Sequence, residues 1–168
     1  MNFNTAISQM MIFINTANKE DILPKGSIAV KTIVTSELTR KIANKYGVEL
    51  KNVLTGFKYI GDKIARALEN NGKVFQIGYE ESYGYLINPA VRDKDGVQSV
   101  MLICEMASYY KHMGKTLYDV FEELQSKLGY HIESQYSYAA AGIEGVEKIK
   151  KLMHLLRTSN LSSIAGEK

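Results

Sequence analysis

The chain has 168 residues, of which 45% are hydrophobic and 23% are charged, which is enough to bury the core of one domain. Its net charge of +3 comes from scattered residues, without the long basic run that nucleic-acid-binding proteins carry. The single cysteine, Cys104, excludes a disulfide framework and a cysteine-rich zinc site. No apolar run approaches the ~20 residues of a membrane span. We therefore expect a soluble, cytoplasmic protein with no nucleic-acid or membrane partner.

Strand-like and helix-like segments alternate along the first 129 residues. Strands are indicated by β-branched or apolar runs, and helices by apolar residues three or four positions apart. Such alternation is typical of an α/β layered domain. In chain order, we expect a helix near residues 3–14, strands at Ile28–Val34, Val48–Leu54, Val74–Ile77 and Tyr85–Ile87, and helices after Ser36, after Lys58, at about 97–113 and at Leu117–Leu128.

From Tyr130 the pattern changes. Residues 131–138 alternate like an exposed strand, and residues 142–157 form an amphipathic helical pattern. We therefore predict two units, residues 1–129 and residues 130–168. The helical pattern that begins almost at Met1 and the polar ending at Lys168 suggest a piece of a longer protein.

The loop between the third and fourth predicted strands is the most unusual stretch. Glu80, Glu81 and Ser82 stand between Gly78 and Gly84. A carboxylate accepts hydrogen bonds from two neighbouring hydroxyls, and glycines let the backbone approach a ligand closely, so these residues suit a sugar. On spacing alone, an ordinary solvated hairpin loop is the favoured alternative.

The charged turn Arg92–Gly96 precedes a predicted helix. Arg92 and Lys94 place two cations near a helix start, where the backbone N–H groups favour an anion such as phosphate. The alternative is an ordinary helix cap made by Asp93 or Asp95.

Two further segments offer cations to a ligand. Lys58, or the backbone amides beside Gly56, could meet a ligand at another helix start, although a plain cap explains this segment equally well. Lys31 lies in an apolar strand, where a charge is costly unless it emerges at the strand's end or meets an anion. A lysine whose ammonium reaches the surface is the alternative for Lys31.

Other kinds of site have little support. The three histidines, His112, His131 and His154, are far apart and have no cysteine or carboxylate at metal-ligand spacing. Asp93 and Asp95 offer too few oxygen ligands for a dedicated metal site. No glycine-rich phosphate loop follows the first strand. We therefore predict no metal site and no nucleotide site.

Four blocks, taken in order, resemble the third domain of the α-D-phosphohexomutases, and bacterial phosphoglucomutases are the branch they most resemble. The blocks are Val30–Ser36, Thr55–Gly61, Gly78–Tyr85 and Arg92–Gly96, and the similarity runs through nearly all of residues 1–157. The resemblance favours the sugar-binding interpretation of the acidic loop. It implies a three-layer α/β/α domain with a mixed, mostly parallel four-stranded sheet, followed by a strand and helix that open domain four.

The resemblance also implies a role for individual residues. Glu80 and Ser82 match the positions that hold the sugar's hydroxyls, and Lys94 would help to hold the non-reacting phosphate of a hexose phosphate. The full expected substrate-binding set is Glu80, Ser82, Lys94, Arg92, Gly56, Phe57, Lys58 and Lys31.

The family's phosphoserine, magnesium and domain-four phosphate loops have no counterpart in this sequence. The resemblance therefore implies an enzyme that interconverts hexose 1-phosphates and 6-phosphates, using Mg²⁺ and a sugar bisphosphate activator, of which this chain is an inactive piece that binds neither cofactor. Tyr83-Gly84-Tyr85 stands where other branches often carry a histidine, which favours glucose phosphates and leaves mannose and pentose phosphates open. A free-standing sugar-phosphate-binding or regulatory module is the alternative.

Overall fold

The computed structural model describes residues 23–69, 72–131, 139–159 and 163. The chain divides into two compact units, Met1–Glu133 and Ser134–Lys168. The predicted helix near residues 3–14 and the predicted strand at residues 132–138 lie outside the described residues. No helix within the described ranges is long and apolar enough to cross a bilayer.

The first unit is built on a four-stranded sheet with the order β2-β1-β3-β4. Its strands are β1 (Ser27–Thr32), β2 (Glu49–Val53), β3 (Val74–Tyr79) and β4 (Tyr85–Leu86). β1 runs parallel to both of its neighbours, and β4 is antiparallel to β3. The expected mixed, mostly parallel four-stranded sheet is confirmed.

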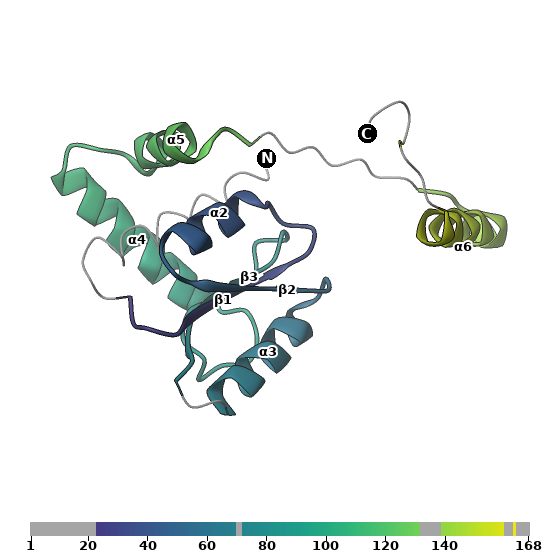
Figure 1. Ribbon diagram of the computed structural model, residues 1–168, viewed down its shortest axis with the longest axis horizontal. Helices are drawn as coiled ribbons and strands as arrows, with labels where there is room; N and C mark the ends of the chain where they lie inside the picture. The colour runs from purple at the N-terminus through teal and green to yellow at the C-terminus, as the bar shows by residue number, and fades with distance from the viewer. Residues whose placement is uncertain (1–22, 70–71, 132–138, 160–162, 164–168) are drawn as a thin grey trace. The chain divides into compact units, whose positions relative to one another are not determined.

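Helices cover both faces of this sheet. α2 (Leu38–Lys45) and α3 (Phe57–Glu69) lie on opposite sides of it (Figure 1). α4 (Gly96–His112) and α5 (Leu117–Leu128) pack into the same core cluster as α2. The α/β/α arrangement is therefore confirmed.

The central strand β1 supplies both cores. Ile28 and Val30 point to the α3 side, whereas Ala29 joins the cluster on the α2 side. This alternation follows from the two-residue period of a strand. All six residues of β1 are buried, as expected for a parallel strand covered on both faces.

The first predicted strand was wrong at its last two residues. β1 ends at Thr32, and Ile33 and Val34 are 53% and 50% exposed. Ile33 N still donates to Val53 O, but β2 ends there, and Thr35 N turns back to donate to Thr32 O. Strand propensity does not extend a strand beyond its partner.

The predicted acidic loop is shorter than expected. Gly78 and Tyr79 belong to β3, because they pair with Leu86 and Tyr85 of β4. The connection between these strands is therefore residues 80–84. A carbon on Gly78 would lie 2.6 Å from Ile60 Cγ2, so this glycine lets α3 approach β3.

The second unit contains one described helix, α6 (Gly142–Thr158), where the pattern predicts one. Its apolar side chains are largely exposed, and Gly145 is its only buried described residue.

Candidate functional site

The carboxyl ends of β1, β2 and β3 meet at one edge of the sheet, as they must for parallel neighbours. Ligands of open α/β sheets bind outside such ends. Here the edge is completed by the start of α3, by residues 80–84 and by the turn that precedes α4. All of the predicted site residues lie on these segments.

Glu80 and Lys94 are brought together from positions 14 residues apart. Glu80 follows the last residue of β3, and its Oε1 lies 3.1 Å from Lys94 Nζ. The Glu80 side chain is only 6% exposed, whereas that of Lys94 is 56% exposed. The hydrogen bond from Lys94 to the Glu80 carboxylate raises the pKa of Lys94. A fixed carboxylate thus stands beside a cation that reaches solvent.

Phe57 joins this pair from α3. Its ring is buried in the first turn of the helix, and Lys94 Nζ lies 6.0 Å from the ring centroid. This distance is at the outer limit of a cation–π contact. Three of the predicted residues, Glu80, Lys94 and Phe57, therefore lie in one group.

Gly84 makes room for the Glu80 side chain. A Cβ added to Gly84 would lie 2.6 Å from Glu80 Oε1. The same short connection is closed by a 2.9 Å hydrogen bond from Glu80 N to Gly84 O. Tyr83 has φ 63°, an uncommon conformation for a residue with a side chain. Ser82 lies exposed at the tip of this connection.

The turn before α4 is held by Asp95. Its side chain caps the helix by accepting from Val97 N and Gln98 N, so Asp95 rather than Asp93 is the cap. Asp95 N donates to Tyr85 O at 2.8 Å, which ties the turn to β4. Lys94 is therefore carried by an anchored backbone.

Arg92 is placed by α3. A Cβ on Gly61 would lie 2.8 Å from Arg92 O, so the glycine allows the turn to rest directly on the helix. The Arg92 side chain is exposed.

Gly56 and Lys58 lie at the start of α3. Gly56 has φ 114°, a conformation that residues with side chains rarely adopt, and its carbonyl accepts from Tyr59 N. Lys58 Nζ lies 5.0 Å from the ring centroid of Tyr59. Among the described residues, no contact joins Lys58 to Glu80 or Lys94, so the structure does not bring Lys58 into their group.

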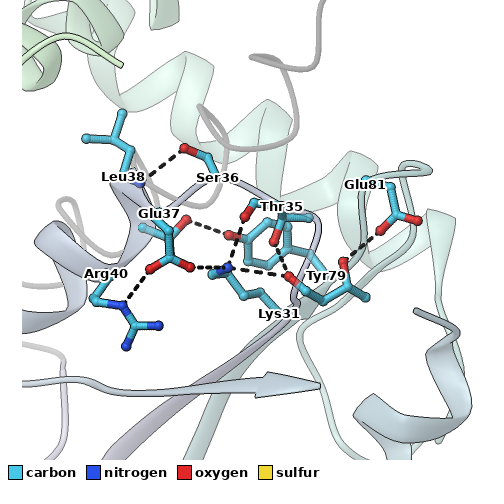
Figure 2. Close-up of polar contacts among 10 residues, drawn as sticks. Lys31, Thr35, Ser36, Glu37, Leu38, Arg40, Tyr79 and Glu81 are labelled. Atoms are coloured by element: carbon cyan, nitrogen blue, oxygen red, sulfur yellow. Dashed lines mark hydrogen bonds and ion pairs between the residues drawn. The ribbon is translucent and has the colours of Figure 1, made fainter. Parts of the chain in front are cut away.

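Lys31 is fully buried, and its ammonium contacts the segment that follows β1 (Figure 2). Its Nζ lies 3.0 Å from Thr35 O and 3.0 Å from Glu37 Oε1, and it also donates to Thr32 O at 3.4 Å. Meeting an anion is one of the conditions that make a strand lysine tolerable, and Glu37 is that anion. The role of Lys31 in substrate binding stays a prediction.

Glu37 is the residue that precedes α2. α2 begins at Leu38, and Ser36 Oγ accepts from Leu38 N at 3.1 Å. The Glu37 carboxylate instead pairs with Arg40 and Lys31, and these two contacts, Arg40 first, lower its pKa.

The contact between Thr32 and Glu81 at this edge was missed by sequence reasoning. Thr32 Oγ1 donates to Glu81 Oε2 at 2.7 Å, so the two neighbouring carboxylates of the acidic loop have different partners. Nothing in the local sequence separates Glu80 from Glu81. The signal that could have found this contact is tertiary, because β1 and β3 are paired neighbours.

The described residues do not offer a metal centre. Among them, no group of three or more His, Cys, Asp or Glu side chains lies where it could hold a metal ion.

A sequence model described as phosphoglucomutase/phosphomannomutase, alpha/beta/alpha domain III, matches residues 8–128. The chain belongs to this family. It is 41% identical over 141 residues to a phosphoglucomutase of Staphylococcus aureus strain bovine RF122 / ET3-1 and 40% identical, over the same length, to that of strain N315. Each match covers 84% of this chain and 25% of the relative.

The solved structures agree on the fold. The open form of parafusin, a phosphoglucomutase from Paramecium, matches with a TM-score of 0.61 and 22% identity, covering 91% of this chain and 27% of that one. The phosphoglucomutase/phosphomannomutase resemblance inferred from the four blocks is therefore confirmed. The chain spans about a quarter of the length of the curated relatives it matches.

Proposed function

We propose that this chain is the substrate-recognition domain of an enzyme that interconverts hexose 1-phosphates and hexose 6-phosphates. The observation that carries the proposal is the Glu80–Lys94 pair at the carboxyl edge of the sheet. A carboxylate accepts hydrogen bonds from sugar hydroxyls, and an ammonium attracts a phosphate. The exposed hydroxyl of Ser82 lies on the same short connection as Glu80.

The proposed reaction uses a phosphoserine outside this chain. A sugar hydroxyl attacks the phosphoserine phosphorus, the serine P–O bond breaks, and the hydroxyl proton leaves to a base. The resulting sugar bisphosphate turns over and returns its other phosphoryl group to the serine. Because the sugar binds in two orientations, groups that read hydroxyls in either orientation suit this cycle. Positioning and electrostatics dominate such a transfer, which is why a recognition domain contributes to the rate.

In this proposal, Mg²⁺ and the sugar bisphosphate activator act at other parts of the longer enzyme. The described residues contain no carboxylate cluster suited to Mg²⁺, so no step of the reaction is assigned to a metal here. The proposed partners are the hexose phosphate and the remaining domains of that enzyme, in the cytoplasm.

Binding can be tested on the chain as it stands. Glucose 6-phosphate is titrated while backbone amide shifts are followed, and the expected result is weak binding with shifts at residues 78–84 and 93–96. E80Q and K94M should each weaken binding by about tenfold, because each removes a charge-assisted contact. The matched controls E105Q and K127M change exposed helical residues and should bind as the wild type does. Shifts confined to other regions would overturn the site assignment.

The same titration addresses the choice of sugar. Mannose 6-phosphate and ribose 5-phosphate are compared with glucose 6-phosphate, which we expect to bind most tightly. Tightest binding of ribose 5-phosphate would favour the pentose branch instead.

A separate assay tests the division of labour. Conversion of glucose 1-phosphate to glucose 6-phosphate by this chain alone is expected to be undetectable, with Mg²⁺ and glucose 1,6-bisphosphate supplied. Turnover that is abolished by E80Q would show that the phosphoryl carrier is inside this chain and would contradict the proposal.

A further inference from the structure

The two neighbouring carboxylates after β3 have different partners. Glu80 pairs with Lys94, whereas Glu81 Oε2 accepts a 2.7 Å hydrogen bond from Thr32 Oγ1. Figure 2 shows Glu81 reaching from its loop toward the end of β1. This contact joins residues 49 positions apart. It links the connection that carries Glu80 and Ser82 to the central strand.

Thr32 is held in place by burial, strand pairing and a hydrogen bond. It is fully buried as the last residue of β1, and it is paired with Val53 of β2. Its carbonyl accepts from Thr35 Oγ1 at 2.7 Å. The buried ammonium of Lys31 donates hydrogen bonds to Thr35 O and Glu37 Oε1 (Figure 2). The segment that follows Thr32 is therefore fixed as well.

The tip of the connection that carries Glu81 is exposed to solvent. Ser82 and Tyr83 are exposed, and Tyr83 is held at φ 63°. The hydrogen bond from Glu80 N to Gly84 O closes the connection, and the Thr32–Glu81 contact ties it to the end of β1. A carboxylate that accepts from a buried hydroxyl is a strong restraint, because the bond is charge-assisted.

We propose that Glu81 is a positioning residue, which acts through Thr32 to orient residues 80–84 and thereby to present Glu80 and Ser82 to the sugar. This inference rests on the proposed function and adds a residue pair to it. The alternative is that Glu81 itself binds the ligand. The two differ in one respect: a positioning role requires that loss of either partner, including the fully buried Thr32, loosens residues 80–84 as well as weakening binding.

The test compares E81A, E81Q, T32V, T32S and the double variant T32V/E81A in the full chain. Two quantities are measured without and with ligand respectively: hydrogen exchange of the Glu80 amide, whose bond to Gly84 O closes the connection, and the dissociation constant for glucose 6-phosphate. E81A and T32V should each speed exchange and weaken binding by about tenfold, the effect of losing a hydrogen bond to a charged group. The double variant should be no worse than either single variant, since both remove the same contact.

Two conservative variants should retain the hydrogen bond that T32V and E81A remove. T32S keeps the donor and E81Q keeps an acceptor oxygen, so both should stay within about threefold of the wild type in affinity and exchange. Urea unfolding of every variant checks that the domain remains folded at the temperature of the titration.

Several outcomes would overturn the inference. Weaker binding in E81A with unchanged binding in T32V would make Glu81 a direct ligand. Unchanged exchange in both variants would remove the positioning role. If the wild type fails to bind glucose 6-phosphate, the proposed function fails, but the exchange measurements still decide whether Thr32 and Glu81 order the connection.

Discussion

Two lysines at the same edge of the sheet have opposite environments. Lys31 is fully buried and bonded to Thr35, Glu37 and Thr32, whereas Lys94 is more than half exposed and has Glu80 as its ionic partner. The first ammonium has its hydrogen bonds satisfied within the fold. The second is more than half exposed, so a phosphate can reach it from solvent while it keeps its contact with Glu80. We expect Lys31 to contribute more to stability than Lys94 does, and the exposure of Lys94 supports its proposed contact with the ligand.

The largest expected effect comes from K31M. Methionine keeps the length of the side chain but leaves the buried carbonyl of Thr35 without the ammonium, and Glu37 without this cation. We expect the free energy of unfolding to fall by about 2–4 kcal/mol, as for loss of a buried charged hydrogen-bond partner. Urea denaturation measures this fall. K94M is the comparison and should lower the free energy of unfolding by less, because the Lys94 side chain is 56% exposed, although this variant leaves Glu80 without its cation. Equal effects of the two variants would remove the distinction between the two lysines.

A second variant is designed to displace the backbone of the turn that carries Lys94. In G61A the new Cβ would lie 2.8 Å from Arg92 O, so the turn that carries Lys94 has to move. Overpacking outweighs the better helix propensity of alanine, and we expect a loss of about 1–2 kcal/mol in urea denaturation. Amide shifts should change at residues 92–96.

The control for G61A is G96A, at the first residue of α4. A Cβ at Gly96 would meet no atom within 4 Å, so its stability should stay within about 0.5 kcal/mol of the wild type. A stable G61A with unchanged shifts would show that the turn does not depend on this close contact.

The stability at acidic pH tests the ion pairs that Glu37 makes with Lys31 and Arg40. Arg40 and Lys31 lower the pKa of Glu37 below its ordinary value of 4.5, so the stabilisation by this carboxylate is present above pH 4.5 and is lost as the pH falls through its lowered pKa. E37Q should therefore be less stable than the wild type at pH 7, with a difference that shrinks on acidification. Because Glu37 is largely exposed, the effect should be smaller than that of K31M.

Urea midpoints at pH 7 and pH 3 measure this difference. E105Q, on the exposed side of α4, should remain close to the wild type at both pH values. A difference for E37Q that grows toward pH 3 would contradict the assigned ion pair.

The stability at alkaline pH tests the ion pair between Lys94 and Glu80, and we expect this effect to be the smallest. The Glu80 carboxylate raises the pKa of Lys94 above its ordinary value of 10.5, so any stabilisation is complete below pH 10.5 and is lost as the pH rises through the raised pKa. The small stability difference between the wild type and K94M should therefore vanish at high pH. Thermal midpoints of both proteins at pH 8 and above pH 10.5 measure it, and a difference that persists would show that the charge of Lys94 is not its source.

Much of the fold could be predicted because it depends on local patterns. The helix expected at about 97–113 forms at Gly96–His112, and the next expected helix, which carries Leu117 and Leu128, forms at Leu117–Leu128. Both are marked by apolar spacing, and α5 also by the capping box of Thr116 and Asp119. The end of β1 was missed, because Ile33 and Val34 have strand propensity but no strand beside them.

The sequence predicted which residues belong to the candidate site better than it predicted the contacts that they make. The four blocks identified the family from sequence alone, and they singled out Glu80 and Lys94, which the fold brings within 3.1 Å. Sequence did not show that Lys58 lies over Tyr59 instead, or that Glu81 bonds Thr32. Side-chain partners of this kind depend on which strands are neighbours.

The sequence by itself determined the order of strands and helices, the family and the residues of the acidic loop, because each of these is written in short segments. Only the tertiary structure decided which lysine is buried and which carboxylate faces which partner. The register between β1 and β3 is the physical reason: a bulge after Ile28 skips Gln76, so that Lys31 stands opposite Tyr79 and Thr32 comes beside the residues that follow. A register between strands more than 40 residues apart depends on packing across the whole sheet, which no single segment encodes.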